Sequence, residues 1–164
     1  MRTDRGHVPV SARAADCGLT WPGPGGWWDW LADRQFLLAL LAAVPAWALL
    51  GLTVGPRMHL VTGWDGWISF LLVQPLAEEF EFRGVLQGQW LRWSAARRVG
   101  PVTRASLGVT AAFVALHFLV QPPLWALAVA LPSLVFGHLG ERFGSVLPAV
   151  VVHAVYNAGF AVTA

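Results

Sequence analysis

The residues best suited to chemistry lie in the middle of the chain, where three carboxylates fall within four positions. They are Glu78, Glu79 and Glu81, and Arg83 follows them. The apolar run 66–73 leads into this stretch with no turn signal between them. Charged side chains at bilayer depth are energetically costly, so they usually face a partner or a water-filled cavity. The sequence therefore predicts partners or a cavity for these groups.

One partner is visible in the spacing. Glu79 and Arg83 are four residues apart, so a helix places them on one face, and the acid precedes the base, which is the favourable order. Glu78 points about 100° away from Glu79. The spacing predicts a structural clamp between Glu79 and Arg83 that leaves Glu78 available for catalysis. The alternative is an ordinary helix at the membrane surface whose acids are solvated.

The other apolar segments contain few histidine or amide side chains, namely His117, His138, His153 and Asn157. Counted along their helices from one end of the bundle, Glu78, His117, His153 and Asn157 lie about 12–21 Å deep. His153 and Asn157 are also four residues apart and share a helical face. The sequence thus predicts that these four side chains meet in one layer. His138 has no such companion and is interpreted as structural.

A carboxylate, two imidazoles and an amide suit acyl hydrolysis. Glu78 can act as a general base on water with help from an imidazole, and His and Asn side chains can donate hydrogen bonds to an oxyanion. The sequence contains no Gly-x-Ser-x-Gly elbow, no His-Glu-x-x-His motif and no phosphate-binding loop. Glu78, His117 and His153 could also ligate zinc with one open position, and the spacing leaves this alternative open.

The composition is that of a membrane protein. Hydrophobic residues make up 56% of the 164 positions, and the mean hydropathy is +0.56. The formal net charge of +2 rests on arginine, and nothing in the sequence indicates a nucleic-acid partner. Cys17 is the single cysteine, which excludes an internal disulfide.

Five helical segments are predicted from the apolar runs: 36–54, 66–93, 105–120, 124–139 and 145–163. Several of these segments contain prolines, and the second segment is expected to bend or break near Pro75. The predicted fold is all-α, a polytopic membrane helix bundle with about five membrane spans over residues 36–164. Residues 1–35 are predicted to form a polar N-terminal tail and a Trp-rich interfacial segment.

The arginines predict an orientation. If the 92–104 loop is cytoplasmic, only Arg57 among the loop and tail arginines faces out. Nine lie inside: Arg2, Arg5, Arg13, Arg34, Arg92, Arg97, Arg98, Arg104 and Arg142. This bias predicts an inner-membrane protein with its N-terminus in the cytoplasm and its C-terminus outside.

Three motifs occur in order on separate predicted helices: Glu78-Glu79-Phe80-Glu81-Phe82-Arg83, Phe113-Val114-Ala115-Leu116-His117 and His153-Ala154-Val155-Tyr156-Asn157. They resemble the EExxxR, FxxxH and HxxxN motifs of the CAAX-protease and bacteriocin-processing family (CPBP, also called Abi), whose members are glutamic-type intramembrane proteases. The resemblance covers about residues 66–160. It implies that Glu78 with His117 activates water, and that His153 with Asn157 holds the oxyanion.

The resemblance further implies that Glu79 and Arg83 shape the site or position the substrate, with Arg83 in contact with it. No catalytic metal or cofactor is implied. In length the chain is more like small bacterial members that process C-terminal sorting tails than like the eukaryotic prenyl-protein proteases. The expected partners are a membrane-anchored protein or peptide and the lipid bilayer.

Two alternatives to catalysis remain open. One is a non-catalytic binding or immunity protein of the same family. The other is a small proton-coupled transporter that uses Glu78 and the histidines as a relay. A transporter is disfavoured because five spans without a repeated half leave little room for alternating access.

Overall fold

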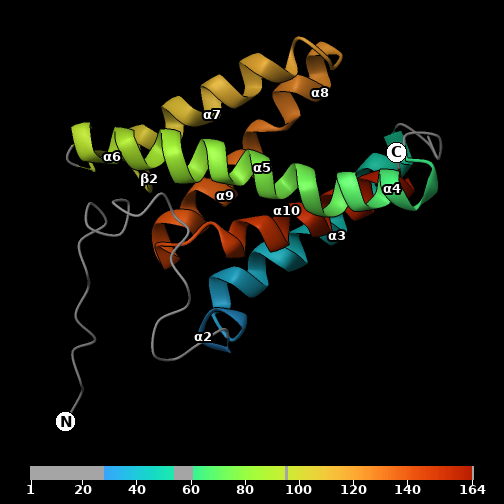
Figure 1. Ribbon diagram of the computed structural model, residues 1–164, viewed down its shortest axis with the longest axis horizontal. Helices are drawn as coiled ribbons and strands as arrows, with labels where there is room; N and C mark the ends of the chain where they lie inside the picture. Colours follow the sequence, from blue (N-terminus) through green and yellow to red (C-terminus); the bar gives the residue numbers. More distant parts are fainter. Residues whose placement is uncertain (1–27, 54–60, 95, 164) are drawn as a thin grey trace.

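The computed structural model describes residues 28–53, 61–94 and 96–163 (Figure 1). The predicted polar tail, Cys17 and most of the Trp-rich segment lie outside these residues. The described elements are, in order, α2 (Trp28–Leu31), α3 (Arg34–Thr53), α4 (Gly63–Ile68), the π-helix η2 (Ser69–Val73), α5 (Gln74–Glu79), the π-helix η3 (Phe80–Gln87), α6 (Gly88–Ser94), strands β1 (Arg98–Val99) and β2 (Val102–Thr103), α7 (Arg104–His117), α8 (Pro123–Ala128), α9 (Ala130–Phe143) and α10 (Leu147–Thr163).

The predicted all-α class is confirmed for these residues, and the helices follow the predicted segments closely. Local differences appear, and one of them is that α9 continues to Phe143, four residues beyond the predicted segment 124–139. The 92–104 loop contains a two-residue β-hairpin, in which Arg98 pairs with Thr103, and α7 ends at His117 although the apolar run continues to Val120. This run is followed by Gln121, Pro122 and Pro123. Pro122 is the N-cap of the next helix, α8, and Pro123 is its first residue.

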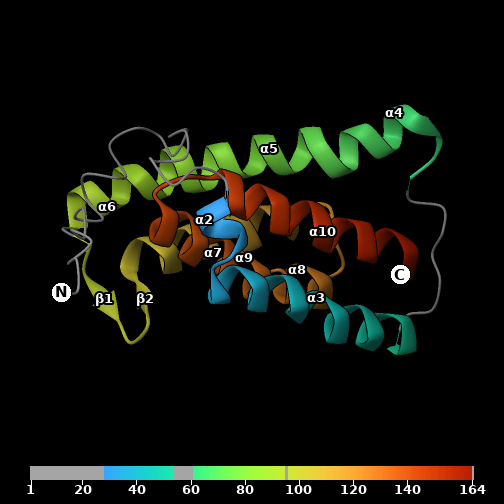
Figure 2. The ribbon, with the colours of Figure 1, turned by 90° about the horizontal axis from the view of Figure 1, so that it is seen from below.

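The helix from α4 to α6 is continuous and runs along the whole bundle (Figure 2). The expected break at Pro75 is therefore wrong. Proline removes one backbone donor, and the chain accommodates the loss with the π-helical turn η2 immediately before it. Pro75 is the second residue of α5 and lies inside this continuous helix, so its missing N–H has to be compensated by a donor from elsewhere.

The core lies where α10 packs against α3 and α9. Trp30 and Phe36 meet there edge to face, with their ring centroids 4.8 Å apart, and Phe136 belongs to the same cluster. Trp30, a residue of the predicted interfacial segment, is thus buried. A Cβ at Gly159 would lie 1.8 Å from the Trp47 indole, so glycine is what allows α3 to approach α10 this closely.

The outer surface is apolar. On α3, Leu38 and Leu41 are exposed over 60% and 64% of their surface. Exposed apolar faces of this kind are unusual in a soluble monomer. The stretch Pro123–Phe143 is long and apolar enough to cross a membrane, and the shorter stretches Arg34–Leu49 and Leu147–Ala161 are also apolar. A membrane bundle fits these observations, while the number of five spans stays a prediction.

Asp33 joins α3 to α9. Its Oδ1 accepts hydrogen bonds from the backbone N–H groups of Gln35 and Phe36, which caps the start of α3. Its Oδ2 lies 2.6 Å from Arg142 Nη2. The hydrogen bond from Arg142 is the main reason that the pKa of Asp33 lies below its ordinary value. Beside it, His138 Nε2 and Gln35 Oε1 lie 2.7 Å apart.

This pairing predicts a pH dependence. Because the pKa of Asp33 is lowered in the folded state, its stabilising effect is complete above the unfolded-state value of about 3.9 and disappears as the pH falls through the folded-state value. We expect Asp33→Asn to lower the thermal unfolding midpoint in detergent at neutral pH, and the difference from the unaltered chain to vanish in acid. A difference that stays constant down to about pH 2 would contradict this origin.

Candidate active site

Two adjacent glutamates at the end of α5 face different surroundings. Glu79 is fully buried, whereas the Glu78 side chain is 23% exposed. The predicted clamp is confirmed, since Arg83 Nε lies 3.2 Å from Glu79 Oε2. A step of one residue, about 100° around the helix, therefore separates a buried carboxylate with a charged partner from a carboxylate that water can reach.

His153 lies between these two glutamates. Its Nδ1 is 2.8 Å from Glu79 Oε1, and its Nε2 is 3.8 Å from Glu78 Oε2. The ring also stacks on Phe136, with centroids 4.7 Å apart and planes within 15°. Because an ionised carboxylate only accepts hydrogen bonds, Nδ1 carries a hydrogen in this arrangement. Glu79 thus fixes the ring so that Nε2 faces Glu78.

Arg83 is enclosed by protein. Its Nη2 donates to the backbone oxygen of Ser133 at 3.1 Å and to the Ser133 hydroxyl at 2.7 Å, and that hydroxyl lies 2.9 Å from Thr110 Oγ1. The guanidinium carbon is 4.8 Å from the centre of the Phe113 ring. Sequence reasoning missed Ser133 and Thr110. The available signal was that both are polar residues inside otherwise apolar segments.

Asn157 supplies a hydrogen bond that Pro75 cannot make. In η2 the Gln74 N–H donates to Ser69 O, five residues earlier, so the same pattern would pair Phe70 O with residue 75. Proline has no N–H to donate. Asn157 Nδ2 donates to Phe70 O instead, at 3.0 Å. An amide group carries two hydrogens on its nitrogen, so one remains for another acceptor.

His117 closes α7 and is held by its own helix. Its Nδ1 lies 2.9 Å from Phe113 O, and since a carbonyl only accepts, Nδ1 carries the hydrogen and Nε2 is left as an acceptor. The His117 ring packs against Phe113 with centroids 4.4 Å apart, and the Phe113 ring in turn lies 4.8 Å from the guanidinium carbon of Arg83. The structure therefore places Glu78, Glu79 and His153 in one cluster, with His117 near it and Asn157 one helical turn beyond His153.

The described residues contain no preformed site for a zinc ion. Within residues 28–53, 61–94 and 96–163, no group of three His, Cys, Asp or Glu side chains is arranged to hold a metal ion. Glu78 Oε2 and His153 Nε2 lie 3.8 Å apart, and the other ring nitrogen of His153 is directed at Glu79.

The Arg83 network predicts a large stability effect. Arg83→Ala leaves Glu79 buried without its cation, and we expect a loss of about 3–5 kcal/mol in the free energy of unfolding. The double variant Glu79→Gln with Arg83→Met removes both charges at similar volume and should recover much of that loss. Denaturant unfolding in detergent checks this cycle. Equal losses in the single and double variants would show that the ion pair is not what stabilises this region.

The hydrogen bond from Asn157 to Phe70 O predicts that a second substitution can restore stability lost by the first. Asn157→Ala leaves Phe70 O without a donor, and we expect it to cost about 1–3 kcal/mol of stability. Pro75→Ala restores a backbone N–H at the position that faces Phe70 O, so the double variant should be more stable than Asn157→Ala alone. Unfolding of the four chains in the same detergent tests this. If Pro75→Ala gave no gain in the Asn157→Ala background, the assigned bond would be wrong.

Comparison with known proteins gives one result. The family model described as Type II CAAX prenyl endopeptidase Rce1-like matches residues 61–159, which include all three motifs and the cluster around His153. No curated protein and no solved structure matches the chain. The match covers more than half of the chain and agrees with the resemblance seen in the motifs. The chain therefore belongs to the Rce1-like family of type II CAAX prenyl endopeptidases, a family of membrane-embedded proteases.

Proposed function

We propose that this protein is an intramembrane endopeptidase of the glutamic type, which hydrolyses a peptide bond in a membrane-anchored protein. The observation that supports it best is the position of His153, hydrogen-bonded to the buried Glu79 and facing the accessible Glu78 across 3.8 Å. Glu79 holds the His153 ring beside the accessible Glu78, so a candidate oxyanion donor and a candidate general base lie in one site.

In the proposed reaction Glu78 and His117 activate water. His117 keeps Nε2 as an acceptor because its Nδ1 hydrogen is used by Phe113 O. A water between Glu78 and His117 can therefore give one hydrogen bond to each. Glu78 takes the proton as the water oxygen attacks the carbonyl carbon, and it returns that proton to the leaving amine when the C–N bond breaks.

The oxyanion is held by Asn157 and His153. Asn157 retains one N–H beyond its bond to Phe70 O. His153 can donate from Nε2 only when it is protonated, because Nδ1–H is already directed at Glu79. Glu78, Glu79 and Arg83 together carry one net negative charge, which a protonated His153 balances. The buried Glu79–Arg83 pair supports the structural role for both residues over direct contact of Arg83 with substrate.

The finer features of function are proposals as well. The substrate is a C-terminal sorting or anchor segment of a bacterial surface protein. The enzyme crosses the bacterial inner membrane about five times, with its N-terminus in the cytoplasm and its C-terminus outside. The distribution of the arginines supports this orientation.

Co-expression with candidate membrane-anchored proteins tests the function. We expect a shortened product with the intact chain, and a rate about 10²–10⁴-fold lower with Glu78→Gln. Glu81→Gln is the matched control, since Glu81 is exposed on the same helix three residues further on. The membrane content of each variant is measured alongside.

The same experiment separates the alternatives. Cleavage that survives a strong chelator supports a glutamic mechanism, whereas loss of cleavage under chelation would indicate the zinc site. Full activity of Glu78→Gln would overturn the assignment of the base. A stable complex that is never cleaved would favour the non-catalytic binding protein.

A further inference from the structure

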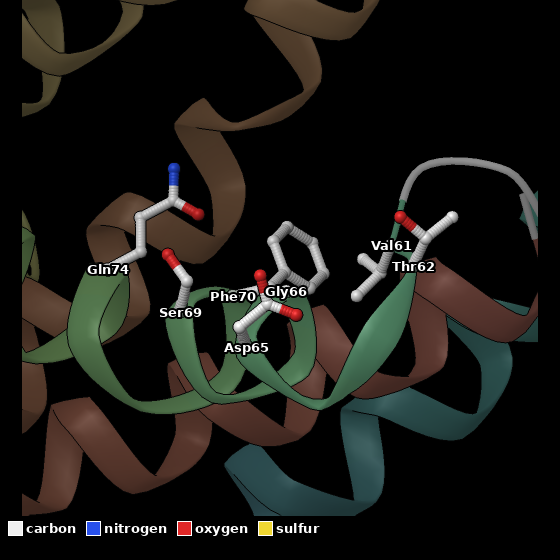
Figure 3. A pocket seen from close by; sticks show the side chains of 7 residues that line it. All are labelled: Val61, Thr62, Asp65, Gly66, Ser69, Phe70 and Gln74. Carbon is white, nitrogen blue, oxygen red and sulfur yellow. The ribbon is translucent and has the colours of Figure 1, made fainter.

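A polar pocket of about 380 Å³ lies at the start of the long helix, away from the cluster around His153. Its polar lining comes from Thr62, Asp65, Ser69 and Gln74. Figure 3 shows Asp65, Ser69 and Gln74 projecting from the same side of α4, η2 and the start of α5. Nothing in the proposed mechanism uses these side chains.

The π-helical turn is what aligns them. In a regular α-helix, positions 69 and 74 would differ by about 140° around the axis. The Gln74 N–H instead donates to Ser69 O, and the Ser69 N–H donates to Asp65 O, so the three residues stack one turn above another. Glu78 follows Gln74 by four residues within α5 and continues the same face.

All three side chains are exposed, and none pairs with another side chain in the described part of the chain. Polar side chains without hydrogen-bond partners inside a membrane bundle are energetically unfavourable unless a polar group or water binds to them. A peptide that is cut inside a bilayer also has polar groups without partners. Its unwound backbone N–H and C=O groups need hydrogen-bond partners where water is scarce.

We propose that Asp65, Ser69 and Gln74 form a binding groove for the substrate chain on one side of the scissile bond, with a basic substrate side chain held at Asp65. The groove rests on the proposed protease function and adds a substrate preference to it. Ser69 and Gln74 supply donors and acceptors for the extended backbone of the substrate. Asp65 is the charged group of the pocket and selects a cation.

The helix sets the position of that cation. Thirteen residues separate Asp65 from Glu78, a distance of about 20 Å along the helix axis. An extended peptide covers about 3.4 Å per residue. The basic substrate residue therefore lies about five or six positions from the bond that is cut.

Lipid-anchored peptides with one variable position test the groove. The peptides are identical except for a single Arg, Gln or Glu, which is moved one position at a time, and they are added to the protein in proteoliposomes. Binding is measured by photo-crosslinking to the Glu78→Gln variant, and cleavage by the wild type is located by mass spectrometry. Asp29→Arg, on the exposed surface of α2, is the control for the charge change in Asp65→Arg.

We expect the best Arg peptide to bind at least about fivefold more tightly than its Glu counterpart, with a smaller difference at high salt. Asp65→Arg should reverse this preference and Asp29→Arg should leave it unchanged. Ser69→Ala and Gln74→Ala should weaken all peptides alike. The cleaved bond should lie five or six residues from the preferred Arg.

The experiment distinguishes an error in the proposed groove from an error in the proposed protease function. Cleavage with no charge preference in either the wild type or Asp65→Arg would overturn the groove and leave the protease standing. A charge preference that Asp65→Arg reverses, without any cleavage, would support the groove and overturn the protease. Absence of binding by every peptide would overturn the groove.

Discussion

The structure depends on one buried carboxylate. Glu79 has no exposed surface, and an isolated charge in such a place is strongly unfavourable. It is tolerated because Arg83 lies at 3.2 Å on one side and His153 at 2.8 Å on the other. Through Arg83 the charge also reaches Ser133 on α9. One carboxylate therefore ties the long helix to both α9 and α10.

A second constraint is the proline in the long helix. Pro75 leaves Phe70 O without its backbone donor, and Asn157 supplies the missing hydrogen bond from α10. The π-helical turn that precedes Pro75 has a further effect, because it brings Gln74 into line with Ser69. A residue that a sequence pattern interprets as a break thus becomes a point of attachment, and the turn around it determines which side chains share a face with Glu78.

The sequence predicts what is local. The Glu79–Arg83 pair follows from a spacing of four, and the helices follow from apolar runs. Contacts between helices are not encoded in spacing, so the hydrogen bond from His153 to Glu79 and the support of Arg83 by Ser133 were not foreseen. The π-turns were missed because a period of 3.6 residues was assumed throughout. The expected bend or break at Pro75 came instead from the missing N–H of proline, and it did not anticipate a donor on another helix.

Glu78 and Glu79 show how neighbouring identical residues acquire different properties. A rotation of about 100° places one carboxylate among Arg83, His153 and the core, and leaves the other 23% exposed. The buried carboxylate cannot reach substrate, but it orients His153, whose second nitrogen faces Glu78. The accessible carboxylate is within reach of water and can exchange protons with it. The proposed division between an orienting and a reacting glutamate is thus a consequence of helix geometry applied to two adjacent positions.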